Sequence, residues 1–176
     1  IDSRTPHDAE YKKKAGTILT SLNAPLGKYA VIGNHDNRLR AELQLAADIL
    51  ESGGFTVLIN QSILIDQVLL IGLDESYFGR PDLELARNER LDKTADSAPG
   101  DYWPLLLCHQ PDYAARLPAD SARLILAGHS HNGQVTLFGR PIITVYQGED
   151  YPYGLYDLDP DRQMIVSRGL GTVGPE

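Results

Sequence analysis

The first half of the chain alternates between apolar residues at helical spacing and short, continuous apolar runs. An amphipathic helix is predicted over residues 5–22, with Thr5 and Pro6 at its start. A second amphipathic helix is predicted from residue 39 to residue 50, and Gly53 closes it. Each helix is followed by an apolar run that is too short for a helix and is typical of a strand.

The second half is richer in predicted strands and ends in hairpins. Residues 74–101 are polar with one weak helical pattern, and a short helix is predicted from Pro111 to Leu117. Helices between the early strands and hairpins at the end predict an α/β fold, in which two packed β-sheets are flanked by helices. The predicted strands span residues 28–32, 55–60, 62–66, 68–73, 105–108, 122–127, 134–138, 141–146, 154–158 and 163–168.

Composition narrows the class of protein. The 176 residues are 42% hydrophobic and 23% charged, which fits one soluble globular domain over residues 1–176. The net charge of −8 argues against a broad nucleic-acid footprint, because a phosphate backbone requires basic patches. No apolar run approaches the length of a membrane span, and no signal peptide is visible.

The single cysteine, Cys108, excludes an internal disulfide. It lies at the end of an apolar run, beside His109. A buried small hydrophobic residue is the interpretation we favour. A Cys–His nucleophile pair is the alternative, but adjacent residues on a strand point to opposite faces, so the two side chains would diverge.

Three apolar strands run into loops that contain histidine. The first loop holds Asn34 and His35, the second begins at His109, and the third holds His129 and His131. Each histidine alone is more often structural or exposed than functional. Together they predict a metal site at one edge of a buried sheet, since imidazole is the commonest protein ligand for borderline metals.

These motifs resemble those of the calcineurin-like metallophosphoesterases. The resemblance follows motif order and spacing over nearly the whole chain, and is strongest to a bacterial branch that acts on lipid-linked or nucleotide-linked phosphates. It implies a two-layer β-sandwich flanked by helices, in four αββα layers. The matching segments are Gly33-Asn34-His35-Asp36, His109, Gly128-His129-Ser130-His131-Asn132-Gly133-Gln134 and Gly169-Leu170-Gly171.

Two motifs of the family are absent from this sequence. They are an Asp-x-His at the first strand and a Gly-Asp-x-x-Asp at the second, and Asp2 is in position to be the last aspartate of the latter. We therefore expect the chain to be the C-terminal two-thirds of the full domain, with the N-terminal βαβ portion missing. We also expect these residues alone to bind at most one metal firmly and to hydrolyse phosphodiesters poorly.

The resemblance implies a role for each residue of the matching loops. Asn34, His109 and His129 would bind one divalent metal, and His131 would bind the other. His35 would face the phosphate, as a general acid or as a donor to the leaving oxygen. The implied activity is hydrolysis of a phosphomonoester or phosphodiester by water activated between two metals, with Mn, Fe, Zn or Ni suiting mixed N and O ligands.

Several neighbouring residues carry weaker expectations. Asp36 either positions its loop or caps the helix that follows it, and the cap is the role we favour. Tyr77 and Trp103 are candidates to shape substrate entry, whereas Glu149 and Asp150 are expected in a solvated loop.

An alternative function is a non-catalytic interaction scaffold that keeps the phosphoesterase fold. For the enzyme, the resemblance implies a small phosphate ester or a phospholipid-like substrate, and association with a membrane surface. The protein is then expected in the cytoplasm or at the periphery of the cytoplasmic membrane.

Overall fold

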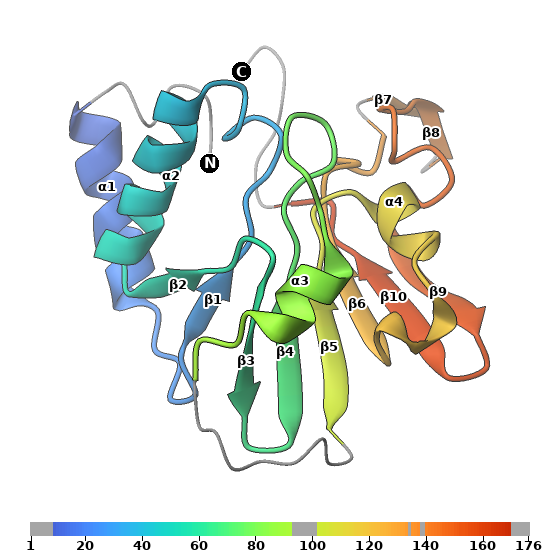
Figure 1. Ribbon diagram of the computed structural model, residues 1–176. Coiled ribbons are helices and arrows are strands. Elements are labelled where there is room, and N and C mark those ends of the chain that lie inside the picture. Colours follow the sequence, from blue (N-terminus) through green and yellow to red (C-terminus); the bar gives the residue numbers. More distant parts are fainter. Residues whose placement is uncertain (1–8, 93–101, 134, 138–139, 170–176) are drawn as a thin grey trace.

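The computed structural model describes residues 9–92, 102–133, 135–137 and 140–169 (Figure 1). The helices are α1 (Ala9–Ser21), α2 (Arg40–Ser52), α3 (Leu83–Asn88) and α4 (Pro111–Ala115), with a 3-10 turn η1 (Ala119–Ser121). The strands are β1 (Lys28–Ala30), β2 (Phe55–Val57), β3 (Gln61–Ile65), β4 (Val68–Gly72), β5 (Trp103–Leu107), β6 (Leu124–Ala127), β7 (Val135–Leu137), β8 (Arg140–Ile143), β9 (Gly154–Asp159) and β10 (Arg162–Val166). No helix in these ranges is long and apolar enough to cross a bilayer.

A six-stranded mixed sheet forms the centre of the fold, in the order β3-β4-β5-β6-β10-β9. The four inner strands β4, β5, β6 and β10 are parallel to one another, and the two edge strands pair antiparallel with their neighbours. The parallel pair β1–β2 and the hairpin β7–β8 form two smaller sheets. Both hairpins predicted at the end of the chain are confirmed.

One face of the large sheet packs against the short helices α3 and α4. Successive residues of a strand point to opposite faces, so every second residue of the apolar strands turns toward these helices. Ile71, Leu106 and Ile125 lie on adjacent strands and are fully buried. They belong to one core cluster with Ala86 of α3 and Ala114 of α4.

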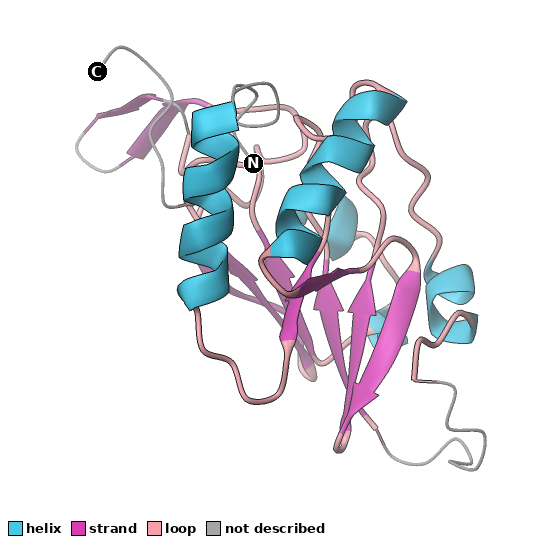
Figure 2. Ribbon diagram, turned by 90° about the vertical axis from the view of Figure 1, so that its left-hand side faces the viewer, coloured by secondary structure: helices cyan, strands magenta, loops and turns pink. Residues whose placement is uncertain are grey.

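The opposite face of the large sheet meets the small β1–β2 sheet. Val31 and Leu58, which follow β1 and β2, approach Gly72 of β4 so closely that a Cβ atom there would overlap the Leu58 side chain. Glycine at this position therefore allows the two sheets to pack directly. Helices α1 and α2 lie in front of the sheets when the molecule is seen from the side (Figure 2). The α/β fold with two sheets between helices is thus confirmed.

The β1–β2 sheet leaves part of this face open. Leu126, Ile165 and Leu155 are side by side in register on β6, β10 and β9, with 37%, 42% and 61% of their surfaces exposed. They form a continuous apolar row across the three strands at the β9 end of the sheet, opposite the edge strand β3. Within the described residues, the second layer of strands therefore covers β4 and leaves these three strands partly uncovered.

The boundaries of two early elements differ from those predicted. Strand β1 ends at Ala30, because Val31 and Ile32 already belong to the segment that turns toward the sheet edge. Helix α2 begins at Arg40, and its N-cap is Leu39, which offers no side-chain hydrogen bond. The prediction that Asp36 caps this helix is therefore wrong, since Asp36 lies too far upstream.

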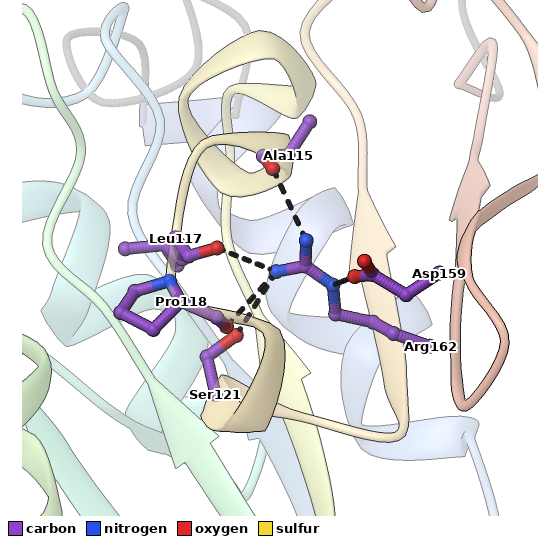
Figure 3. Close-up of polar contacts among 6 residues, drawn as sticks. All are labelled: Ala115, Leu117, Pro118, Ser121, Asp159 and Arg162. Carbon is purple, nitrogen blue, oxygen red and sulfur yellow. Dashed lines mark hydrogen bonds and ion pairs between the residues drawn. The ribbon is translucent and has the colours of Figure 1, made fainter.

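A buried arginine ties the last hairpin to the segment after α4 (Figure 3). Arg162 at the start of β10 is 5% exposed, and its guanidinium donates to the Asp159 carboxylate at 2.7 Å. The same group donates to the Ser121 hydroxyl and to three backbone carbonyls, those of Ala115, Leu117 and Pro118. These carbonyls lie at or just beyond the last residue of helix α4, so Arg162 satisfies the C-terminal end of that helix.

Replacing Arg162 with alanine should destabilise the fold by about 3 kcal/mol, because partly buried carbonyls and the Asp159 carboxylate lose a charged donor. A Tm lower by about 6–12 °C in thermal unfolding would be the corresponding shift. Arg123→Ala is the matched control, since Arg123 pairs with Asp161 at 3.1 Å while both side chains are at least half exposed. The control should cost less than about 0.5 kcal/mol. Equal losses in the two variants would contradict this assignment.

Candidate metal centre

The candidate site forms where several strands end. Strands β4, β5 and β6 are parallel, so their carboxyl ends meet at the same edge of the sheet. We name the loops that follow by a residue of each: the Asn34 loop (33–38) after β1, the Glu75 loop (73–82) after β4, the His109 loop (108–110) after β5 and the His129 loop (128–133) after β6. Ligand sites of open α/β sheets occur at such an edge.

Three of the predicted site residues come together there. The Asn34 Oδ1 atom lies 3.0 Å from Nε2 of His109 and 3.1 Å from Nδ1 of His129. The two imidazole rings are 5.0 Å apart between centroids. His109 and His129 lie 75 and 95 positions after Asn34 in the sequence, and they thus converge on a single amide oxygen.

The protonation of His129 is set by a backbone carbonyl. Both of its ring nitrogens face oxygen atoms that only accept hydrogen bonds, and we assign the ring proton to Nε2 because its 2.9 Å contact with the Tyr146 carbonyl is shorter than the 3.1 Å contact of Nδ1 with Asn34 Oδ1. Nδ1 then presents a lone pair to the Asn34 Oδ1 atom, which is also an acceptor. Two acceptors in contact repel each other, and a cation between them removes the repulsion. The donor set of one amide oxygen and two imidazole nitrogens therefore fits a borderline divalent metal.

Burial keeps the two converging histidines neutral. Burial, and to a smaller extent electrostatic repulsion from His129, lowers the pKa of His109 to about 3. Burial also lowers the pKa of His129. Neutral imidazole is the form that can donate a lone pair to a metal, so both rings are available as ligands at neutral pH.

The Asn34 loop is shaped to admit the His109 ring. A Cβ atom at Gly33 would lie 2.8 Å from Cε1 of His109, so only glycine leaves room for the imidazole. Asp36 accepts a hydrogen bond from the Gly33 backbone N–H at 3.1 Å, and its own N–H donates to the Gly33 carbonyl at 2.9 Å. Asp36 therefore closes the turn that presents Asn34, which is the role it has instead of a helix cap.

The remaining two predicted site residues lie outside the three-residue cluster. His35 and His131 are both exposed, and neither ring has a hydrogen bond to the described part of the chain. Burial, and to a smaller extent electrostatic repulsion from His35, lowers the pKa of His131. The repulsion indicates that the two rings face a common region. His131 and Asn132 adopt left-handed backbone conformations, with φ of 52° and 60°, which turn the His129 loop sharply.

Tyr77 and Tyr146 surround His129, and only Tyr77 was a candidate from the sequence. The Tyr77 hydroxyl lies 3.0 Å from Nε2 of His129 and donates to the Tyr146 carbonyl. The two tyrosine rings are stacked with centroids 5.8 Å apart, and Phe78 meets Tyr77 edge to face. Tyr146 and Phe78 are 67% and 56% exposed. Together with the half-buried ring of Tyr77 they form a group, which we call the aromatic rim, at the border of the candidate site.

Trp103 and the segment after Tyr146 do not contribute side chains to the cluster. Trp103 lies at the start of β5, at the opposite end of that strand from His109, where it borders an open hollow with Arg123. The prediction that Trp103 shapes substrate entry is therefore wrong. Glu149 and Asp150 are exposed as expected, and their backbone N–H groups donate to Asp112.

Cys108 has the structural role favoured by the sequence. It is 1% exposed, and burial raises the pKa of its thiol to about 12. The thiol donates to the Gln110 carbonyl at 3.6 Å and belongs to the core cluster. Cys108 and His109 therefore form no nucleophile pair.

Glu75, a fully buried carboxylate in the Glu75 loop, was not predicted from the sequence. The signal was present, because Glu75 follows an apolar strand just as the histidines do. Among the described residues, no group of three or more His, Cys, Asp or Glu side chains is placed to hold a metal, so the cluster consists of two histidines and an amide. Other positions to which the sequence drew attention lie outside the described residues: Asp2, Thr5, Pro6, His7, Gln134, Leu170 and Gly171.

Comparison with known proteins gives relatives along almost the whole chain. An uncharacterized metallophosphoesterase, YkuE of Bacillus subtilis, is 31% identical over 172 residues, which are 94% of this chain and 57% of YkuE. An uncharacterized metallophosphoesterase of Aquifex aeolicus is 33% identical over 163 residues, covering 90% of this chain and 58% of the relative. Phosphodiesterase YaeI of Escherichia coli is 29% identical over 163 residues, covering 89% of this chain and 56% of YaeI.

The chain therefore spans a little over half the length of these relatives. No family model matches the sequence, and no solved structure matches it. Two of the three relatives are named metallophosphoesterases and the third a phosphodiesterase, and the loops that carry the resemblance come together at one edge of the sheet. These relatives and the matching loops support membership of the calcineurin-like metallophosphoesterase family.

Proposed function

We propose that the protein hydrolyses a phosphomonoester or phosphodiester with two divalent metal ions at this edge of the sheet. The observation that carries the proposal is the contact of Asn34 Oδ1 with nitrogen atoms of two neutral, partly buried histidines. A cation removes the repulsion between the lone pairs that meet there. The names of the relatives, which include a phosphodiesterase, support the same class of reaction.

Asn34, His109 and His129 would hold one metal through these three atoms, and His131 would serve the other. When bound, two metals bind the phosphate and activate the attacking water. Tyr146 fixes the tautomer of His129 through its carbonyl, as a backbone acceptor commonly does for a metal-binding histidine. His35 is exposed at the same edge, free of hydrogen bonds to the described residues, and can turn toward a departing oxygen to give it a proton.

The aromatic rim supports a substrate with an apolar group. Exposed rings of Phe78 and Tyr146 beside the cluster offer a surface on which an acyl chain or ring of a phosphate ester can pack. A small phosphate ester with an apolar substituent, including a phospholipid-like one, is therefore the substrate class we propose. Manganese is the first metal to test, with Fe, Zn and Ni as alternatives.

Removing a histidine of the site should remove metal and activity together. We expect about two Mn per chain in the full-length protein by elemental analysis, with turnover of bis-p-nitrophenyl phosphate. His109→Ala and His131→Ala should each lower metal content and reduce turnover by more than about a hundredfold, because even outer-sphere partners are worth 10–100-fold. His7→Ala is the control, since His7 belongs to none of the matching loops. A full-length protein with neither metal nor turnover would support the scaffold function instead.

His35→Gln should reduce kcat without reducing metal content, because the ring lies outside the cluster. The loss should depend on the leaving group: about 10²–10⁴-fold for methyl phenyl phosphate, which needs a proton, and much less for methyl p-nitrophenyl phosphate. Steady-state kinetics on this matched pair gives the comparison. Equal losses on both substrates, or a loss of metal, would show that His35 is not the proton donor.

Phe78→Ser should weaken binding of an apolar substrate only. Comparing methyl and octyl p-nitrophenyl phosphate in steady-state kinetics, we expect KM to rise about fivefold for the octyl ester, which corresponds to about 1 kcal/mol of aromatic contact. KM for the methyl ester should stay constant, because that substrate has no long apolar group to pack on the ring.

The matched control for this variant is Leu85→Ser. Leu85 is 44% exposed on α3, outside the aromatic rim, so its loss should leave KM for both esters unchanged. A rise in KM for the octyl ester in both variants, or in neither, would contradict the proposed substrate class.

A further inference from the structure

Glu75 is the most completely buried acidic side chain near the candidate metal centre, and the proposed chemistry does not use it. It is 0% exposed and accepts hydrogen bonds from five donors. Three of these are backbone N–H groups of its own loop, those of Tyr77, Phe78 and Gly79, at 2.7–2.8 Å. The carboxylate therefore orders the Glu75 loop from within.

The other two donors come from the loops that carry the candidate ligands. Asn37, in the Asn34 loop, donates its side-chain amide to Oε1 of Glu75 at 3.1 Å. Gln110, next to His109, donates to Oε2 at 2.9 Å and is itself fully buried. One carboxylate thus joins the Asn34 loop to the His109 loop, with a different oxygen atom for each.

A second contact strengthens the connection to the His109 loop. The Gln110 side-chain oxygen accepts from the Ser76 backbone N–H at 3.1 Å, while the Ser76 hydroxyl donates to Gln147 at 2.6 Å. Gln147 directly follows Tyr146, whose carbonyl fixes His129. The connections from Glu75 therefore reach the neighbourhood of all three residues in the cluster.

Glu75 also keeps its charge through hydrogen bonds from neutral groups. Burial alone would raise the pKa of the carboxyl, but the N–H groups of Tyr77 and Phe78 and the amides of Gln110 and Asn37 hold it below its ordinary value of 4.5. The salt bridges found within the described ranges all involve other carboxylates. A buried anion beside a site for divalent cations favours their binding.

We infer that Glu75 is a positioning residue that fixes the spacing of the Asn34 and His109 loops and thereby sets the metal affinity of the site. The inference rests on the proposed function. It predicts that Glu75 acts on metal binding beyond any effect on folding, since its contacts lead to the ligand loops as well as to its own.

The test compares Mn²⁺ binding by the full-length protein and three variants, using isothermal titration, with Tm and turnover of bis-p-nitrophenyl phosphate measured alongside. Glu75→Gln keeps the size of the side chain but turns one oxygen into an NH₂ group that faces N–H donors. Asn37→Ala removes only the contact to the Asn34 loop, and serves if Glu75→Gln does not fold. Asp74→Asn is the matched control, because Asp74 orders the same loop through the Glu75 and Arg80 N–H groups without reaching either ligand loop.

We expect Glu75→Gln to weaken Mn²⁺ binding about tenfold and Asn37→Ala to weaken it several-fold, with Asp74→Asn unchanged. Unchanged Mn²⁺ affinity in folded Glu75→Gln or Asn37→Ala, or an equal loss in Asp74→Asn, would overturn the inference.

The outcomes separate this inference from the proposed function. Mn²⁺ binding without turnover in the unaltered protein would contradict the hydrolase, while the variants would still decide the role of Glu75. Turnover in the unaltered protein, together with unchanged Mn²⁺ affinity in the folded variants, would support the hydrolase activity and overturn the role of Glu75. A protein that binds no Mn²⁺ and has no turnover would overturn both.

Discussion

The close approach of two histidine nitrogens to one amide oxygen is the constraint on which the rest of the site depends. His109 Nε2 and His129 Nδ1 lie 3.0 Å and 3.1 Å from Asn34 Oδ1, although the lone pair of His129 Nδ1 repels that oxygen. The surrounding fold holds this arrangement in place. Gly33 leaves room for one ring, and the Tyr146 carbonyl holds the proton on the far side of the other.

Burial favours the neutral form of the titratable groups in this region, and Glu75 is charged in spite of it. Burial lowers the pKa of His109 and His129, so their rings stay neutral and can serve as ligands. Glu75 is buried as well, yet five donors keep it ionised. The region therefore combines neutral ligands with a fixed negative charge, an arrangement that suits a cation.

The strands and the loops that carry histidine could be predicted, because each apolar run that forms a strand is followed by the polar residues of a loop. The parallel order of β5 and β6 then brings the His109 and His129 loops to one edge, which is a property of the topology, while the Asn34 loop reaches that edge from β1 of the small sheet. For Asp36 the sequence left two roles open and the favoured one was wrong, because turn closure and helix capping use the same short carboxylate. Glu75 was missed although it follows an apolar strand as the histidines do, because that position alone does not show that its five hydrogen-bond donors come from three separate loops.

The reactivity of the Cys108 thiol can report local opening of the fold at β5. Cys108 is the single cysteine of the chain, lies one residue before His109, and is packed in the core. A thiol with a pKa of about 12 and no access to solvent does not react with alkylating reagents while the sheet is intact. The rate at which such a reagent labels the native protein therefore measures how often β5 separates from its neighbours, at the strand that carries a candidate ligand.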